Sequence, residues 1–190
     1  MADFSALQAQ LPQVLARRSH KMSHFFTVEE LDLKFSNGTQ MTYERLGGGN
    51  GAVLAVPFDG KYFLMSAEYA CGFERYELGF VKGKIEKGES PEQALARELG
   101  EELGYGFKHC VKLRDEMTVA PGMLSLRMHC FLCTDLYTHR LESGDEPEPI
   151  AMIKVTPDEA KELVFYKDSP LTESRAIACL ALSLRALDFI

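Results

Sequence analysis

The chain has 190 residues, of which 46% are hydrophobic and 26% charged, enough for one sizeable core or one core with a small appended subdomain. Its net charge of −7 argues against general nucleic-acid binding, which needs a basic surface, and the composition is not that of a disordered or repeat protein. There is no secretory signal pattern and no apolar run of the ~18 residues that span a bilayer, so we expect a soluble, cytoplasmic protein.

The first clear structural signal is a hairpin. Residues 28–35 and 39–46 are both rich in strand-forming side chains, and the pair Asn37-Gly38 between them is typical of a two-residue type I′ turn. Ahead of this hairpin, a helix or an arm is expected over about residues 5–17.

A glycine-rich run at residues 47–51 is a flexible break that divides the chain. We therefore predict a small N-terminal antiparallel β subdomain over residues 1–48 and a main domain over residues 49–190. At the start of the main domain, residues 52–57 and 61–66 are predicted to pair as two strands around a tight turn.

The rest of the main domain interleaves predicted strands with three helices. Ser90 and Thr156 each precede a proline and are followed three residues later by Gln93 or Glu159, which is the pattern of a capped helix start. Few helices among many strands predict an α+β fold, an α/β/α sandwich with a mixed sheet. Strands are predicted over 107–116, 126–136 and 150–156, and helices are predicted to begin near 91, 157 and 172.

Two of the five cysteines, Cys130 and Cys133, invite a metal or disulfide interpretation. They lie in a predicted strand, where an offset of three places two side chains on opposite faces. Ordinary reduced cysteines are therefore the better interpretation.

The first predicted helix carries carboxylates beside its buried face. Leucines that recur every four residues form that face: Leu95, Leu99 and Leu103. At ~100° per residue, Glu98 and Glu102 fall on or beside this stripe, and Glu101 lies further round. Carboxylates that are partly buried and within one turn of each other are costly unless a hard divalent cation, Mg²⁺ or Mn²⁺, compensates them. The alternative is a solvated acidic face in which Arg97 pairs with Glu101.

The whole segment from residue 83 to residue 105 resembles the Nudix box. Every fixed position of the box is matched, at the right spacing: Gly83, Glu89, Arg97, Glu98, Leu99, Glu101, Glu102, Gly104 and Tyr105. The resemblance implies the Nudix fold and the Mg²⁺-dependent hydrolysis of the pyrophosphate link in a nucleoside diphosphate derivative.

The resemblance also implies roles for these residues. Glu98 and Glu102 would be the principal metal ligands, with Glu101 assisting and the backbone carbonyl of Lys82 adding a further ligand. A second group would be structural and hold the loop–helix–loop together: Gly83, Glu89 and Arg97.

Other segments narrow the family to one branch. Pro121, sixteen residues after Tyr105, and the hairpin ahead of the main domain resemble the ADP-ribose pyrophosphatases. The segments 76–83 and 144–149 are similar to the ADP compounds hydrolases of that branch. The resemblance implies activity on ADP-ribose, NADH and short diadenosine polyphosphates with release of AMP, and a homodimer built through the N-terminal subdomain.

The chain departs from that branch in its basic residues. ADP-ribose pyrophosphatases tend to carry an Arg where Ala67 or Ala70 stands here. We therefore take Arg45 and Arg75 as candidate substrate-binding residues that replace this contact, although each alone is more often a surface charge.

The general base that the resemblance implies is a Glu on a loop after the core strands. The loop over residues 141–150 contains glycine and two prolines, which exclude regular structure. Glu148 is the first candidate and Glu146 the second, and together with the metal ligand Glu102 they make up the predicted catalytic residues. The alternative is an acidic loop that only interacts with solvent.

Two other functions remain open at this point. One is a Nudix hydrolase with another substrate, such as a nucleoside diphosphate sugar, coenzyme A or capped RNA. The other is a nucleotide sensor without turnover, although such domains typically lose a box glutamate and this chain retains Glu98, Glu101 and Glu102. Neither a nucleic acid nor a membrane is expected as a partner.

Overall fold

The computed structural model describes residues 2–142 and 148–190. These form two compact units, the first made of residues 1–49 and 118–126 and the second of residues 50–117 and 127–190. In chain order the elements are η1 (Ser5–Gln8), β1 (Gln13–Lys21), β2 (Thr27–Lys34), β3 (Gln40–Leu46), β4 (Ala52–Pro57), β5 (Phe63–Ala70), β6 (Arg75–Gly79), β7 (Lys82–Lys84), α1 (Pro91–Glu102), β8 (Tyr105–Thr118), β9 (Arg127–Thr138), β10 (Ala151–Val155), α2 (Pro157–Phe165) and α3 (Ser174–Ala186).

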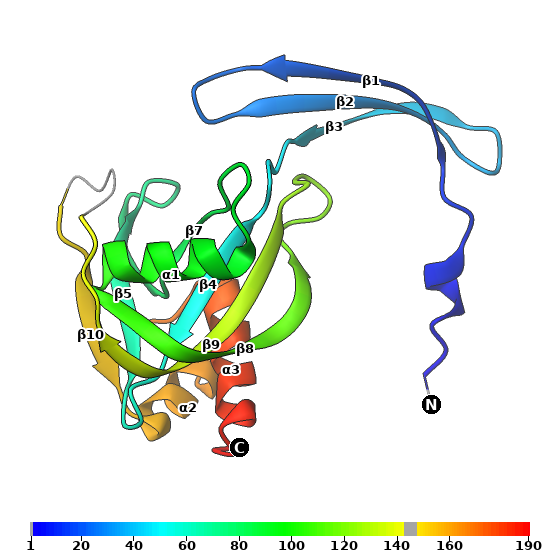
Figure 1. The fold of residues 1–190 in the computed structure, drawn as a ribbon. Helices are drawn as coiled ribbons and strands as arrows, with labels where there is room; N and C mark the ends of the chain where they lie inside the picture. The colour runs from blue at the N-terminus through cyan, green and yellow to red at the C-terminus, as the bar shows by residue number, and fades with distance from the viewer. Residues whose placement is uncertain (1, 143–147) are drawn as a thin grey trace. The chain divides into compact units, whose positions relative to one another are not determined.

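The first unit is built on an antiparallel sheet in the order β1-β2-β3, drawn in blue in Figure 1. Of the expected helix or arm over residues 5–17, the helix is wrong, and the arm ends where β1 begins. Only Ser5–Gln8 form a short 3₁₀ turn, and residues from Gln13 onward pair with β2. Pairing with the predicted hairpin satisfies the backbone of this segment and overrides its weak helical pattern.

The hairpin itself is confirmed, but its turn is not the predicted type I′. The amide of Gly38 donates to the carbonyl of Phe35, and the amide of Phe35 donates to the carbonyl of Thr39. Gly38 has a φ of +86°, whereas Asn37 does not have a positive φ. This is a three-residue loop with glycine in the left-handed position, the next most common way to close a hairpin.

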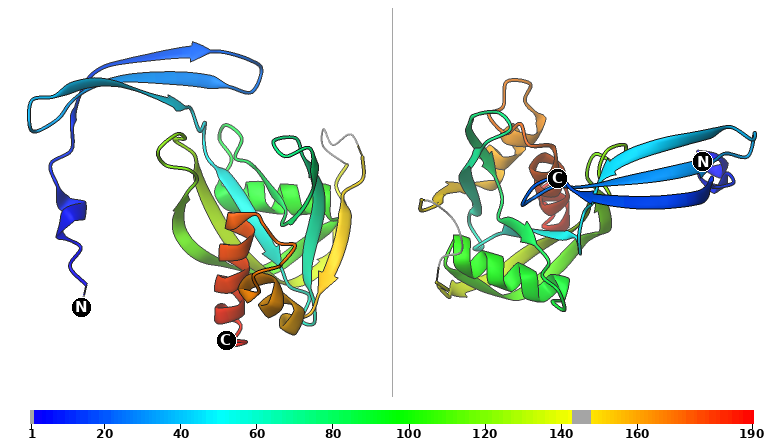
Figure 2. Two further views of the ribbon diagram at one scale, coloured as in Figure 1. Left: turned by 180° about the vertical axis from the view of Figure 1, so that it is seen from behind. Right: turned by 90° about the horizontal axis from the view of Figure 1, so that it is seen from above.

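The second unit contains a three-stranded sheet, β10-β5-β6, and a four-stranded sheet, β7-β4-β9-β8. The four-stranded sheet is mixed because β4 runs parallel to β9 and antiparallel to β7. Helix α1 covers one face of this sheet and α3 the other, as the views in Figures 1 and 2 show. The prediction of an α+β fold with an α/β/α sandwich and a mixed sheet is confirmed.

The expected pairing of residues 52–57 with 61–66 is wrong. These strands belong to different sheets and share only an isolated bridge between Phe58 and Phe63. Both edges of β4 are already used, by β7 and β9, so β4 has no edge to offer to β5. All six residues of β4 are buried, as expected for a central strand with both faces covered.

Helices α1 and α2 begin at the predicted caps, α3 begins at Ser174, two residues after the predicted start, and β8, β9 and β10 lie where strands were predicted. Cys130 and Cys133 are both buried in β9, and all five cysteines are free. Cys133 packs in the core under α1, whereas Cys130 lies beside Cys179 of α3. Within the described ranges, no helix combines the length and the apolar character required to cross a membrane.

Candidate active site

The acidic helix α1 is fixed at both ends by its own sequence. The hydroxyl of Ser90 accepts from the amide of Gln93, whose side chain in turn accepts from the amide of Ser90, and Pro91 occupies the first turn. The helix ends at Glu102, and Gly104 follows with a φ of +73°. Three leucines on one side are buried and hold the helix against β4 and β7: Leu95, Leu99 and Leu103.

Arg97 is the centre of the site. Its guanidinium donates to both oxygens of Glu89 at 3.0 and 3.1 Å, to Glu98 at 2.8 Å and to Glu101 at 3.2 Å. A further bond of 3.0 Å reaches the carbonyl of Lys84. Arg97 therefore ties the loop before the helix, the edge strand β7 and two box carboxylates to one cation.

The carboxylate of Glu98 lies directly over Gly83. A Cβ added at Gly83 would stand 1.8 and 2.3 Å from the two carboxylate oxygens, closer than any real contact. Position 83 therefore has to be glycine for Glu98 to lie against β7. The side chain of Glu98 is only 14% exposed, which fits the sequence prediction that it borders the buried face.

The strand β7 is the open edge of its sheet. The amide of Ala55 donates to the carbonyl of Val81, and the amide of Ile85 donates to the carbonyl of Gly51. In an antiparallel ladder the backbone groups of alternate residues point the other way, so the carbonyls of Lys82 and Lys84 point off this edge. The bond from Arg97 to the carbonyl of Lys84 shows this direction.

Burial and the nearby guanidinium of Arg97 shift the pKa values of Glu98 and Glu89 in opposite directions. Burial raises the pKa of Glu98, although the Arg97 guanidinium beside it favours its charged form. Hydrogen bonds from Arg97 lower the pKa of Glu89, and the bonds from Glu89 and Glu98 raise the pKa of Arg97. Glu89 is thus held as a charged structural partner, whereas the ionised form of Glu98 is costly and favours a cationic ligand.

The donor set fits a hard divalent cation. It consists of carboxylates at positions i and i+4 of α1, Glu98 and Glu102, together with the carbonyl of Lys82 on the open edge, and oxygen ligands suit such a cation. In the part of the chain that the structure describes, no three acidic, His or Cys side chains already form a closed metal-binding group. Arg97 instead contacts Glu98 and Glu101.

A second feature is a cavity of about 620 Å³ beside the β5–β6 hairpin and the start of α3, which we call the hairpin cavity. Arg75 lies on its wall, in an ion pair of 2.6 Å with Glu77. The strand register places Arg75 directly opposite Ala70, one of the two positions where ADP-ribose pyrophosphatases tend to carry an Arg. The role of Arg75 in substrate binding stays a prediction.

The remaining predicted residues are Glu148, Glu146 and Arg45, and neither Glu148 nor Arg45 lines the hairpin cavity. The hydroxyl of Tyr76 on β6 donates to the carboxylate of Glu148, which lies just before β10. Glu146 falls outside the described residues. Arg45 belongs to the first unit and forms an ion pair of 2.7 Å with Glu29 across β2 and β3.

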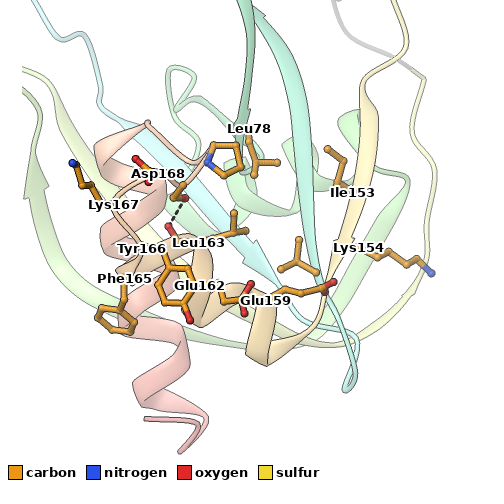
Figure 3. A pocket seen from close by; sticks show the side chains of 13 residues that line it. Leu78, Ile153, Lys154, Glu159, Glu162, Leu163, Phe165, Tyr166, Lys167 and Asp168 are labelled. Atoms are coloured by element: carbon orange, nitrogen blue, oxygen red, sulfur yellow. Dashed lines mark hydrogen bonds between the residues drawn. The ribbon is translucent and has the colours of Figure 1, made fainter.

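Another cavity, of about 880 Å³, is bordered by β10, α2 and the turn after it. Figure 3 shows Leu78, Ile153 and Leu163 among its lining side chains, with Lys154 and Lys167 at opposite ends. None of its lining residues comes from the box helix or from β7. It lies outside the candidate active site.

Comparison with known proteins decides the family. The model of the NUDIX domain matches residues 50–173, and the model of the NudE-type Nudix hydrolase N-terminal domain matches residues 12–45. The chain belongs to the Nudix family. The prediction of a Nudix pyrophosphohydrolase is confirmed, and Nudix hydrolases generally use a divalent metal.

Individual relatives of this Nudix hydrolase share most of its length. It is 39% identical over 174 residues to the ADP compounds hydrolase NudE of Escherichia coli (strain K12), covering 91% of each chain. It is 37% identical over 121 residues to the ADP-ribose pyrophosphatase of Bacillus subtilis (strain 168), covering 63% of this chain and 64% of the relative. A crystal structure of an ADP compounds hydrolase superposes with a TM-score of 0.85 at 38% identity, covering 95% of this chain and 96% of that one.

The sequence did not predict the strands that line most of the hairpin cavity of this Nudix hydrolase. Residues 67–84 received no predicted strand, and they contain half of β5 with all of β6 and β7. The turn-forming segment around Gly72, between two short runs with alternating side chains, was a usable signal for a hairpin. The facing carboxylates Glu68 and Glu77 could then have been placed together.

Replacing Arg97 by Lys is expected to lower the stability of the fold. Lys keeps the charge but cannot reproduce the forked bonds to Glu89 and the bond to the carbonyl of Lys84. Because Arg97 is about one quarter exposed, we expect a loss of about 2 kcal/mol rather than that of a fully buried pair. Chemical denaturation, with Arg114→Lys on β8 as the control, measures this difference. An unchanged midpoint would contradict the central role of Arg97.

Proposed function

We propose that the protein hydrolyses the pyrophosphate bond of ADP-containing compounds, including ADP-ribose, NADH and diadenosine polyphosphates, and releases AMP. The observation that carries the proposal is the complete Nudix box with the Glu98 carboxylate against Gly83 on an open strand edge. The names of the two curated relatives, ADP compounds hydrolase NudE and ADP-ribose pyrophosphatase, support the substrate class.

Within this proposal the metal is Mg²⁺, with Mn²⁺ as a possible replacement. Glu98, Glu101 and Glu102 hold it, with the carbonyl of Lys82. When bound, such an ion neutralises the diphosphate, orients it and activates a water for attack on phosphorus. The absence of a side chain at Gly83 leaves room for the Glu98 carboxylate, and Glu89 and Arg97 keep the loop and helix in position.

Glu148 is proposed as the general base, with Glu146 as the second candidate. Its hydrogen bond from Tyr76 leaves the carboxylate with further acceptor positions and keeps it on the side of the β5–β6 hairpin. A positioned base that removes the proton of the attacking water typically contributes ~10²–10⁴-fold to the rate. Arg75, and Arg45 from the first unit, are proposed to bind the substrate.

The decisive experiment is a substrate panel. The purified protein is incubated with MgCl₂ and ADP-ribose, NADH, NAD⁺, diadenosine triphosphate, ADP-glucose or capped RNA, and products are identified by mass. We expect AMP from ADP-ribose, NADH and the dinucleotide. Turnover of ADP-glucose or capped RNA alone would keep the Nudix chemistry and replace the substrate, and binding without turnover would favour a sensor.

We further propose a homodimer that acts in the cytoplasm without nucleic-acid or membrane partners. The sheet of the first unit has one polar face, where Arg18 bonds Glu30 and Asp32, and an opposite face with an apolar part, which we call the apolar face. Two residues of the apolar face, Met41 and Tyr43, are 54% and 46% exposed. A three-stranded sheet needs a second layer on such a face, and a second copy of the chain can supply it.

The dimer is expected to depend on this apolar face. Replacing Met41 by Glu and Tyr43 by Lys removes apolar area from the face without shortening β3. Sedimentation velocity should then show a monomer for the variant and a dimer for the native chain. Replacing Thr42 and Glu44 on the polar face serves as the control. A native chain that sediments as a monomer would overturn the proposal.

A further inference from the structure

We propose that the hairpin cavity binds the vicinal hydroxyls of a ribose in the substrate. This inference rests on the proposed hydrolysis of ADP compounds and assigns one part of the substrate to a site on the protein. The cavity lies wholly within the second unit, between β5, β6, β7 and the first turn of α3. Its volume of about 620 Å³ is within the usual range of small-molecule sites, about 300–1,000 Å³.

Two carboxylates face each other on the wall of the cavity. Glu68 on β5 is paired in register with Glu77 on β6, so both side chains are on one face of the hairpin. Like charges directly opposite each other in a sheet are destabilising. Each carboxylate is compensated by its own cation, since Lys82 bonds Glu68 and Arg75 bonds Glu77 at 2.6 Å.

The charge of the cavity is therefore balanced before any ligand enters. A third pair, Arg175 with Glu173 at 2.6 Å, completes the balance at the start of α3. A phosphate would have to displace carboxylates from their cations, and a bare cation would meet the three basic groups. A neutral group rich in hydroxyls leaves the three ion pairs in place. Carboxylates accept hydrogen bonds from ribose hydroxyls in dinucleotide-binding enzymes.

Ser66 provides the observation that points to a ligand. It lies on the same face of β5 as Glu68, lines the cavity and is 1% exposed. Within residues 2–142 and 148–190, its hydroxyl has no hydrogen-bond partner. A buried hydroxyl without a partner is costly, and a ribose hydroxyl in the cavity would supply the missing bond.

The cavity has free space next to this hydroxyl. Gly79 is paired in register with Ser66, and a Cβ added at Gly79 would meet nothing within 4 Å. Phe73 also lines the cavity and is 72% exposed, so its ring can pack against the apolar parts of a nucleoside. The open space beside Gly79 and the ring of Phe73 match a sugar with an attached base.

The cavity and the box carboxylate Glu98 both border the strand β7. Lys82, which bonds Glu68 in the cavity, directly precedes Gly83, against which Glu98 lies. Neighbouring side chains of a strand point to opposite faces, so a substrate whose diphosphate is held at Glu98 has to pass the open edge of β7 to place a neighbouring sugar in the cavity. ADP-ribose has a ribose on each side of its diphosphate, so either sugar can be the one that is bound.

The experiment compares ADP-ribose with two analogues, one lacking the 2-hydroxyl on the adenosine ribose and the other lacking it on the distal ribose. We expect kcat/KM to fall by about tenfold or more for one analogue only, because loss of a hydroxyl leaves buried polar groups unpaired. The analogue that loses activity identifies the sugar. Equal kcat/KM for all three substrates would overturn the proposal.

Two variants then locate the recognition. Gly79→Val fills the open space without backbone strain, since φ at Gly79 is not in the left-handed region, and should raise KM by about tenfold or more. Ser66→Ala should reduce the preference for the hydroxyl by about fivefold without lowering Tm. Ser183→Ala is the matched control, because Ser183 is also buried and its hydroxyl also has no partner in the described chain, but it lies outside the cavity.

The test separates this inference from the proposed function. Calorimetry of the same three nucleotides with the metal-free protein measures the hydroxyl preference without turnover. If none of them is hydrolysed, the proposed function fails, and the binding preference still supports or refutes the ribose site. A preference that persists unchanged in both Gly79→Val and Ser66→Ala would place the recognition elsewhere and overturn the inference.

Discussion

Replacing Glu102 by Gln is expected to abolish pyrophosphate hydrolysis while the fold stays intact. Gln has nearly the same shape as Glu but carries no charge and only one acceptor oxygen. Loss of one electrostatic contact to the transition state typically costs about 10²–10³-fold in kcat. We therefore expect kcat to fall by at least about 10²-fold, measured with ADP-ribose at saturating Mg²⁺.

The control for this variant is Glu92→Gln. Glu92 lies in the first turn of the same helix, is exposed and is not one of the fixed positions of the box. Its replacement should leave kcat unchanged, and both variants should melt within a few degrees of the native protein. A Glu102→Gln protein with a native rate would refute the assignment of Glu102 as a metal ligand.

Replacing Gly83 by Ala is expected to displace Glu98 and reduce activity by about 10²-fold. The new methyl group would stand 1.8 to 2.3 Å from the carboxylate oxygens of Glu98, so the carboxylate has to move away from β7. The backbone of Gly83 does not have a positive φ, so the variant tests the contact with Glu98 rather than backbone strain. Steady-state kinetics over a range of Mg²⁺ concentrations should show an increased metal requirement.

Two further variants make this test specific. Gly122→Ala is the control, because a Cβ there meets nothing within 4 Å. Shortening the carboxylate in the double variant Gly83→Ala/Glu98→Asp gives room for the methyl group, so it should recover part of the activity relative to Gly83→Ala. Full native activity of Gly83→Ala would mean that the observed place of Glu98 is not required for catalysis.

The acidic helix was the part of the site that the sequence predicted best. Its caps, its leucine stripe and the position of Glu98 beside that stripe depend on neighbours within a few residues, and helical periodicity is enough to place them. The roles of Glu98, Glu101 and Glu102 as ligands remain a prediction, as do those of Glu146 and Glu148.

The features that the sequence did not predict depend on contacts between distant segments. Whether β4 pairs with β5 depends on β7 and β9 occupying both edges of β4, which local pattern does not reveal. The predicted type of the hairpin turn at Gly38 was wrong because the pair Asn-Gly occurs in hairpin loops of more than one length. The facing pair Glu68 and Glu77 depends on the register of a hairpin that was not predicted.

The open edge of β7 has a consequence for the behaviour of the protein at high concentration. Its outward carbonyls can serve the proposed metal site only if no other strand pairs with them, yet an unpaired edge is also where a second molecule can add a strand and begin aggregation. The edge strand is three residues long and has a lysine on each side of Gly83. Short length and lysine charge are the usual protection of exposed edges, so the residues that keep the site accessible also keep the molecules apart.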